Sequence, residues 1–229
     1  MQINSFFYKF LLTSFITLIT PLLVTMQNSS NNYEEASVLL ITSWPSNPNT
    51  KYALLGRENY GSSKDQWDNF GGDKELIDNN KPLNTATREL QEETINLLGN
   101  DSKVRNRLKN KSRKLVNNHK KSITYITYFD HKDLENITQN FYRIRNSSRN
   151  SKNREKNALA WVNYESLKTV IRNAGRDATG KLITPIIMDA NIIDSNNPSF
   201  KHRKKISITL RPFFVSKLQQ AIDSQGKSI

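Results

Sequence analysis

The chain has 229 residues, 36% of them hydrophobic, which is enough for one ordinary domain with appendages. It carries 34 Lys and Arg against 21 Asp and Glu, and the net charge of +13 favours an anionic partner such as a nucleotide, a nucleic acid or an acidic lipid surface. The absence of cysteine excludes disulfides, thiolate metal sites and cysteine nucleophiles, and none of the three histidines is spaced with another to form a zinc site.

An apolar stretch near the start of the chain runs from Phe6 to Met26. Its layout, with Lys9 ahead of an apolar region from Phe10 to Val24, predicts a signal peptide or membrane anchor over residues 1–26. Because no small-x-small cleavage site stands out and the stretch approaches the roughly 20 residues of a membrane span, a cleaved signal and an uncleaved anchor both stay open. A buried helix of the folded domain is the third alternative. We expect export, either to a secreted or periplasmic location or to a membrane.

After a polar linker over 27–36, strands and helices follow one another without regular alternation. Short apolar or alternating runs predict strands over 37–43, 51–58, 67–70, 122–129, 158–163 and 206–210. Helices are expected over 85–98, 101–121, 133–144, 164–173, 185–193 and 212–221. This order predicts α/β layers around a mixed sheet.

The expected domain covers 37–190 and includes a basic insertion at 101–121. A basic C-terminal extension, 191–229, follows and could pack on the domain. The two basic stretches, 101–121 and 201–205, have three interpretations: a solvated face, attraction of a polyanionic substrate, or adhesion to nucleic acid or an anionic membrane. Neither stretch contains an aromatic residue that could stack on a base, which favours the solvated face.

Three carboxylates stand out on the helix expected over 85–98. Glu89, Glu92 and Glu93 are three and four residues apart, so they share one face of the helix, where like charges repel one another. A hard divalent cation, which prefers oxygen ligands, would remove this repulsion. The alternative is a solvated helix face balanced by Arg88 and nearby lysines.

Together with the glycine pair before the helix, these residues resemble the Nudix box of the Nudix hydrolases. The pattern is Gly, five residues, Glu, seven residues, then Arg-Glu-aliphatic-x-Glu-Glu-x-Gly, and the matching residues are Gly72, Arg88, Glu89, Leu90, Glu92 and Glu93. The resemblance covers roughly residues 37 to 190 and implies an α/β/α sandwich with a mixed sheet.

The resemblance also implies a reaction, namely Mg²⁺-dependent hydrolysis of a pyrophosphate bond in a nucleoside diphosphate linked to another group, with Mn²⁺ as an alternative ion. The implied metal ligands are Glu89, Glu92, Glu93 and Glu75, and the implied catalytic residues are Glu93, Glu92, Glu89 and Arg88. Arg88 would orient the carboxylate helix through an ion pair. Substrate contacts are expected at Gly71, Gly72, Arg57 and Phe70. Glu155 is a candidate for a remote general base.

The chain departs from the family pattern at three places. The loop from Gly72 to Arg88 is two residues longer, so the upstream Glu is replaced by Asp78 or Asn80, depending on the end from which one counts. Ile95 stands where the family has its closing Gly, so the helix is expected to continue towards Gly99. These departures, with the charge of +13, motivate the alternative function of a catalytically impaired Nudix-like domain that binds nucleotide or nucleic acid.

The aromatic residues beside the motif have two interpretations. Trp67 and Phe70 suit either core packing or stacking on a base, whereas Trp161 is expected in the core. No recognised specificity motif identifies the nucleotide, and ADP-ribose, a dinucleoside polyphosphate, a sugar nucleotide and a nucleoside triphosphate all remain candidate substrates.

Overall fold

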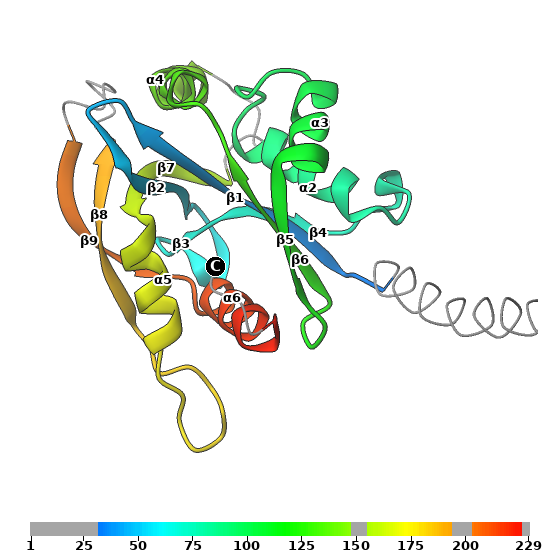
Figure 1. The fold of residues 1–229 in the computed structure, drawn as a ribbon, viewed down its shortest axis with the longest axis vertical. Helices are drawn as coiled ribbons and strands as arrows, with labels where there is room; N and C mark the ends of the chain where they lie inside the picture. The colour runs from blue at the N-terminus through cyan, green and yellow to red at the C-terminus, as the bar shows by residue number, and fades with distance from the viewer. Residues whose placement is uncertain (1–31, 148–154, 194–202, 226–229) are drawn as a thin grey trace, which may run out of the picture.

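The computed structural model describes residues 32–147, 155–193 and 203–225 (Figure 1). The apolar segment predicted over 1–26 lies outside these residues, as does the first half of the linker, 27–31. Within the described ranges, no helix combines the length and the apolar character of a membrane-spanning segment.

In the described residues, nine strands form one mixed sheet in the order β3-β9-β8-β7-β2-β1-β6-β5, with β4 paired to β1. The strands are β1 (Glu35–Trp44), β2 (Asn47–Glu58), β3 (Trp67–Asp68), β4 (Phe70–Asp73), β5 (Ser112–Asn117), β6 (Ser122–Tyr128), β7 (Lys156–Asn163), β8 (Ile186–Ile193) and β9 (Arg203–Leu210). The pairs β1–β6 and β3–β9 are parallel and the others are antiparallel. Because β3 pairs with both β9 and β2, the strands β2, β7, β8, β9 and β3 form a closed circuit.

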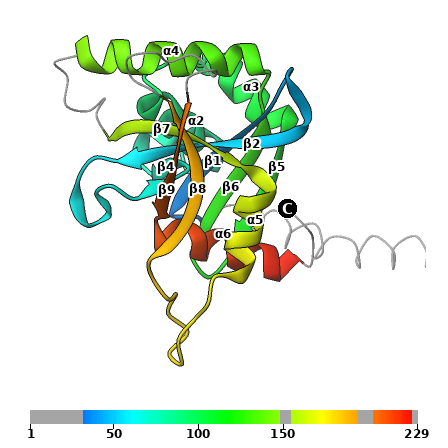
Figure 2. The ribbon, with the colours of Figure 1, turned by 90° about the vertical axis from the view of Figure 1, so that its left-hand side faces the viewer.

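Helices cover both faces of this sheet, as Figures 1 and 2 show from two directions. They are α2 (Pro82–Glu93), α3 (Asp101–Lys111), α4 (His131–Ser147), α5 (Tyr164–Asn173) and α6 (Pro212–Gln225), with short 3-10 turns η1 (Gly61–Ser63) and η2 (Leu76–Asp78). Alternate residues of β1 point to opposite faces, so Val38 and Leu40 join a core under α2, α3 and α4, whereas Leu39 and Ile41 join a core under α5 and α6. The predicted mixed α/β layers are therefore confirmed.

Two predicted helices are wrong in part or in whole. The helix expected over 101–121 ends at Lys111, and residues 112–117 form β5, because Leu115 and Asn117 alternate inwards against β6. The helix expected over 185–193 is the strand β8, which pairs with β9 from Ile186↔Leu210 to Ile193↔Arg203. Pairing with β9, which lies further along the chain, is tertiary information that a short apolar run does not carry.

A buried ion pair fastens α6 to the sheet. The Lys217 ammonium lies 2.6 Å from the Glu35 carboxylate of β1 and donates to the Ser37 hydroxyl at 3.2 Å. The side chains of Lys217 and Glu35 are 2% and 12% exposed. Since β1 also pairs with β4, this contact supports the strand that positions the candidate site.

We expect Lys217→Ala to lower the free energy of unfolding by about 3–5 kcal/mol, because it leaves the Glu35 carboxylate buried without its cation. Lys204→Ala, which removes an exposed lysine of β9, should change it by less than about 0.5 kcal/mol. Urea unfolding of both variants measures the difference. Equal losses would show that the pair does not fasten the helix.

Candidate functional site

The glycine pair of β4 makes room for two neighbouring groups. A Cβ on Gly71 would lie 2.2 Å from Cβ of Ser37 on β1, and a Cβ on Gly72 would lie 2.7 Å from both carboxylate oxygens of Glu89. The backbone of β4 therefore approaches β1 on one side and the carboxylates of α2 on the other, which only glycine allows.

Glu93, the last residue of α2, is held from two sides. Its Oε2 accepts a hydrogen bond from the Gly71 backbone N–H at 2.7 Å, and its Oε1 lies 3.1 Å from the Lys156 ammonium. The residue is 5% exposed. The Gly-Gly strand and the helix are thus joined by the carboxylate itself.

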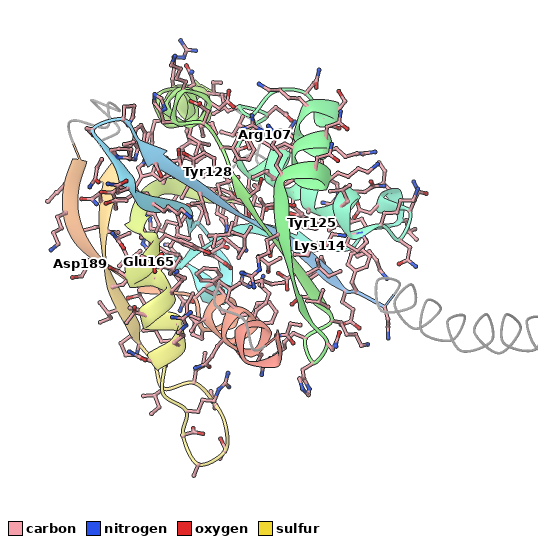
Figure 3. The ribbon with its side chains drawn as sticks, in the orientation of Figure 1. Arg107, Lys114, Tyr125, Tyr128, Glu165 and Asp189 are labelled. Carbon is pink, nitrogen blue, oxygen red and sulfur yellow. The ribbon has the colours of Figure 1, made fainter. Side chains whose placement is uncertain are left out.

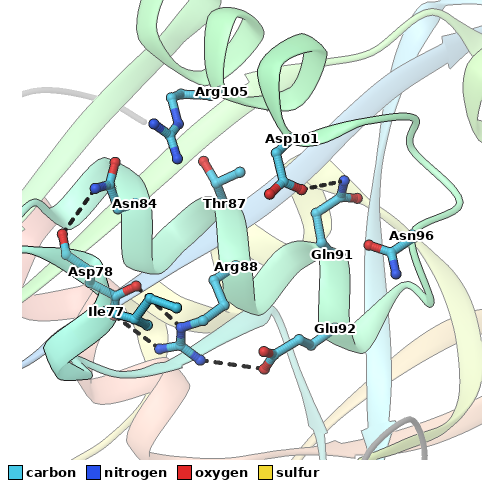
Figure 4. Close-up of a pocket in the computed structure, with 10 residues that line it drawn as sticks. All are labelled: Ile77, Asp78, Asn84, Thr87, Arg88, Gln91, Glu92, Asn96, Asp101 and Arg105. Atoms are coloured by element: carbon cyan, nitrogen blue, oxygen red, sulfur yellow. Dashed lines mark hydrogen bonds and ion pairs between the residues drawn. The ribbon is translucent and has the colours of Figure 1, made fainter.

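Arg88 connects the other carboxylates of the motif. Its Nη1 lies 2.7 Å from Glu89 and 3.3 Å from Glu92, and the same atom is 3.4 Å from Glu75. Its Nη2 donates to the Asp73 carbonyl oxygen at 2.9 Å and to Asp78 at 3.1 Å. Figure 4 shows the guanidinium between Asp78 and Glu92. Arg88 thus makes ion pairs with the carboxylates of its own helix, which are contacts of the kind that the resemblance implies.

Asp78 is a buried acidic partner of Arg88. It is 2% exposed, and its carboxylate accepts hydrogen bonds from the Thr85 hydroxyl at 2.8 Å, the Glu75 backbone N–H at 2.9 Å and Arg88. Burial by itself would raise the pKa of Asp78, but these hydrogen bonds outweigh it and hold the pKa below its ordinary value. Of the two residues that the counting offered, Asp78 contacts Arg88 and Asn80 contacts Lys74.

Two asparagines accommodate the longer loop. Asn79 and Asn80 both have positive φ, 51° and 57°, directly after Asp78. Asparagine adopts this left-handed conformation more readily than most residues other than glycine. The two extra residues thus turn the chain back towards α2 without moving Asp78 away from Arg88.

The end of α2 corrects the expected helix boundary. The helix stops at Glu93 and does not continue towards Gly99, and Ile95 and Asn96 both have a φ of 57°. Ile95 therefore adopts the backbone conformation that the closing glycine of the family pattern would adopt without strain. Its side chain is 8% exposed and packs in the core under α2, which offsets the unfavourable backbone of a β-branched residue.

Lys156 and Glu58 belong to the site and were missed in the sequence. The Lys156 ammonium lies 2.5 Å from Glu58 and 3.1 Å from Glu93, and the lysine side chain is 1% exposed. Pairing of β2 with β7 places Glu58 opposite Lys156. No local spacing indicates this contact between residues 98 positions apart.

Burial perturbs the carboxylates at the end of α2. It raises the pKa of Glu89 to about 7, against the opposing effect of Arg88, and raises the pKa of Glu93 to about 8, against that of Lys156. The pKa of Glu155 is also raised, by partial burial and then by the carboxylates of Glu92 and Glu58. The pKa of Lys156 stays above its ordinary value because Glu93 and other carboxylates outweigh its burial.

The donor set fits a hard divalent cation in its chemistry. Carboxylate oxygens are the ligands that such an ion prefers, and Glu58, Glu89, Glu92 and Glu93 supply them here. The close cations in the described residues are Lys156, Arg211 beside Glu58, and Arg88, which is shared with Asp78. In the described ranges, no three acidic or histidine side chains converge closely enough, as they lie, to hold one ion. The half-exposed Glu92 would have to turn inwards to complete such a set.

The structure does not bring the remaining predicted residues into this cluster. Phe70 is fully buried in the core and cannot offer its ring to a base. Arg57 contacts Asn157 at 2.6 Å and Asp65 at 3.8 Å, and Glu75 is 63% exposed and faces Arg88. Trp67 lies in the core, which was one of its two interpretations, and Trp161 lies in the core as expected.

A cavity of about 350 Å³ lies beside the cluster, along the side of α2 that faces α3 (Figure 4). It shares Arg88 and Glu92 with the carboxylate cluster, and Arg105 of α3 is a further cation in its wall. Its full lining is Ile77, Asp78, Asn84, Thr87, Arg88, Gln91, Glu92, Asn96, Asp101 and Arg105.

The basic insertion uses several of its cations internally. The Arg107 guanidinium lies 3.0 Å from Asp133 and 4.4 Å from the centre of the Phe129 ring, and the Lys114 ammonium lies 5.5 Å from the centre of the Tyr125 ring (Figure 3). Both rings belong to buried side chains, so they offer no free face for a nucleic-acid base.

Comparisons with known proteins find similarity only in solved structures. No family model matches the chain, and no curated protein matches its sequence. A crystal structure of a MutT/Nudix family protein from Enterococcus faecalis is 11% identical with a TM-score of 0.42 and matches 84% of this chain. The chain spans 61% of that protein's length. A MutT/Nudix family protein from Listeria innocua is 14% identical with a TM-score of 0.32, over 84% of this chain and 94% of the other. Likenesses this slight assign no activity to the chain.

The raised pKa of Glu89 predicts how stability depends on pH. The pKa of Glu89 is about 7 in the folded chain, whereas the ordinary value for a glutamate is 4.5. The folded chain therefore holds this proton more tightly than the unfolded chain, so the stabilisation is complete below about pH 4.5 and is lost as the pH rises through 7. In EDTA, Glu89→Gln should therefore flatten the fall in the free energy of unfolding between pH 5 and pH 8 by on the order of 2–3 kcal/mol. Urea unfolding at both pH values tests this, and parallel pH profiles for the variant and the wild type would contradict it.

Proposed function

We propose that the chain is a Nudix-type hydrolase that cleaves a pyrophosphate bond in a nucleoside diphosphate linked to another group. The observation that carries the proposal is the pair of buried carboxylates against the glycine strand, with Glu93 bonded to the Gly71 N–H and Glu89 packed against Gly72. Buried carboxylates with raised pKa values, gathered at one helix end, are typical of a functional site.

Glu89 and Glu92, with Glu93 behind them, would hold the Mg²⁺ ion, and Mn²⁺ would suit the same oxygen ligands. A bound divalent ion would neutralise the negative charge of the pyrophosphate and lower the pKa of the attacking water. Arg88 maintains the orientation of Glu89 and Glu92 through its contacts at 2.7 and 3.3 Å, and Asp78 holds Arg88 in place.

Two further features of the structure suit the reaction: a candidate general base and a cavity that could hold the substrate. Glu155 is exposed just before β7, and partial burial raises its pKa above the ordinary value, which is the direction that makes a carboxylate a better proton acceptor for a general base. The cavity of about 350 Å³ lies next to Arg88 and Glu92, and Arg105 in its wall would pair with a phosphate of the substrate.

A panel of ADP-ribose, a dinucleoside polyphosphate, a sugar nucleotide and a nucleoside triphosphate, with Mg²⁺ and product analysis, tests the activity. Glu93→Gln should lower kcat/KM for any substrate found by about 10²-fold or more, because the carboxylate that fastens the glycine strand to the metal-binding helix is lost. Glu165→Gln, at an exposed carboxylate of α5 (Figure 3), is the matched control and should keep full activity. Undiminished hydrolysis by Glu93→Gln would remove Glu93 from the metal site.

Binding of nucleotide or nucleic acid without turnover is the second candidate function. The position of Lys156 favours it, because an ammonium already lies between Glu58 and Glu93, where carboxylates of an active site would be open to a metal. The net charge of +13 would supply the attraction to phosphates.

This alternative predicts an affinity for single-stranded oligonucleotide that falls by at least about tenfold between 50 and 200 mM salt, since several phosphate contacts would release counterions. Fluorescence anisotropy measures the affinity, and chromatography of the same samples should show no product. Binding that does not respond to salt would contradict the alternative, and turnover would return the assignment to the hydrolase.

A further inference from the structure

A buried lysine occupies the inner side of the carboxylate cluster. Lys156 begins β7, and its side chain crosses directly over Gly56 of β2, where a Cβ would lie 2.8 Å from both Cγ and Cδ of the lysine. The ammonium reaches Glu58 Oε1 at 2.5 Å and Glu93 Oε1 at 3.1 Å. Glycine at position 56 therefore leaves the space through which this cation enters the site.

Both carboxylates on this inner side have close cations. Glu93 gives one oxygen to Lys156 and the other to the Gly71 N–H, while Glu58 contacts Lys156 and, at 3.6 Å, Arg211. A buried carboxylate with a close ammonium and a backbone donor has little need for a further cation.

The outer side of the cluster differs. Within the described part of the chain, Arg88 contacts Oε1 of Glu89 and Oε2 of Glu92, and the second oxygen of each carboxylate accepts no hydrogen bond or ion pair. Glu92 is also half-exposed, so an ion from solvent can reach it. In the described residues, Glu89 and Glu92 thus have one open oxygen each and share the single cation Arg88, whereas on the inner side only Oε2 of Glu58 is open and two cations lie close by.

We propose that Lys156 acts as a permanent cation within the carboxylate cluster, neutralises Glu58 and Glu93, and so limits the site to one divalent ion on the side of Glu89 and Glu92. The inference rests on the proposed function, because it concerns the metal of that site. Lys156 is thereby a residue that determines how many ions the site takes. The lysine ammonium carries one positive charge, whereas a second divalent ion would carry two. Because the lysine is part of the chain, it cannot leave the site as a bound ion can.

The number of Mn²⁺ ions bound by the full-length chain tests this. Titration followed by electron paramagnetic resonance counts free and bound Mn²⁺ without any need for a substrate. We expect one ion on the wild type and a second on Lys156→Met, whose side chain has similar length but no charge and leaves Glu58 and Glu93 to a metal. Lys51→Met, at an exposed lysine of the same strand as Glu58, is the matched control and should bind one ion.

The conservative variant Lys156→Arg keeps the positive charge and should keep the count at one. A wild type that binds two or more ions overturns the inference and leaves the proposed function standing, as does a Lys156→Met variant that binds one ion while its circular dichroism matches the wild type. A wild type that binds no Mn²⁺ overturns the metal of the proposed function and the inference together. Because the wild-type count alone can refute the inference, the test does not depend on whether Lys156→Met folds.

Discussion

The burial of negative charge at the end of α2 is the constraint on which the site depends. Glu89 and Glu93 are 7% and 5% exposed, and a buried carboxylate is stable only where cations or hydrogen-bond donors compensate for its lost hydration. Arg88, Lys156 and the Gly71 N–H provide this compensation, and each comes from a different part of the chain. The helix, the glycine strand and the β2–β7 pair must therefore all be in place before the site exists.

The extra loop residues and Ile95, at which the chain departs from the Nudix pattern, lie outside these contacts. The two-residue insertion is taken up by Asn79 and Asn80 in the left-handed region, and Asp78 still reaches Arg88. Likewise the chain turns at Ile95 with the backbone conformation that favours glycine, so α2 ends at Glu93 even though the glycine is missing. Changes in the loops cost less than an unpaired charge beneath β4 would.

The same charges distinguish the two sides of the carboxylate cluster. On the inner side, Lys156 pairs with both Glu58 and Glu93, and the Gly71 N–H donates to Glu93. On the outer side, Glu89 and Glu92 each keep an open oxygen next to Arg88, and Arg88 and Glu92 also line the cavity that faces α3. Under the proposed function, a metal and the phosphates of a substrate would approach from this outer side. The basic insertion lies beside it on α3, where Arg105 is the residue that reaches the cavity wall.

The sequence by itself determined the local features of this protein. Glu89, Glu92 and Glu93 share a helix face because of their spacing, the Gly-Gly pair precedes that helix, and the runs over β1, β6, β7 and α5 have the periodicity of the elements that they form. Only the tertiary structure decided that residues 185–193 pair as a strand, that Phe70 is buried, and that Lys156 meets Glu58 and Glu93. The physical reason is that periodicity and spacing act between neighbours along the chain, whereas strand pairing and charge compensation join residues far apart in sequence, whose proximity no local pattern encodes.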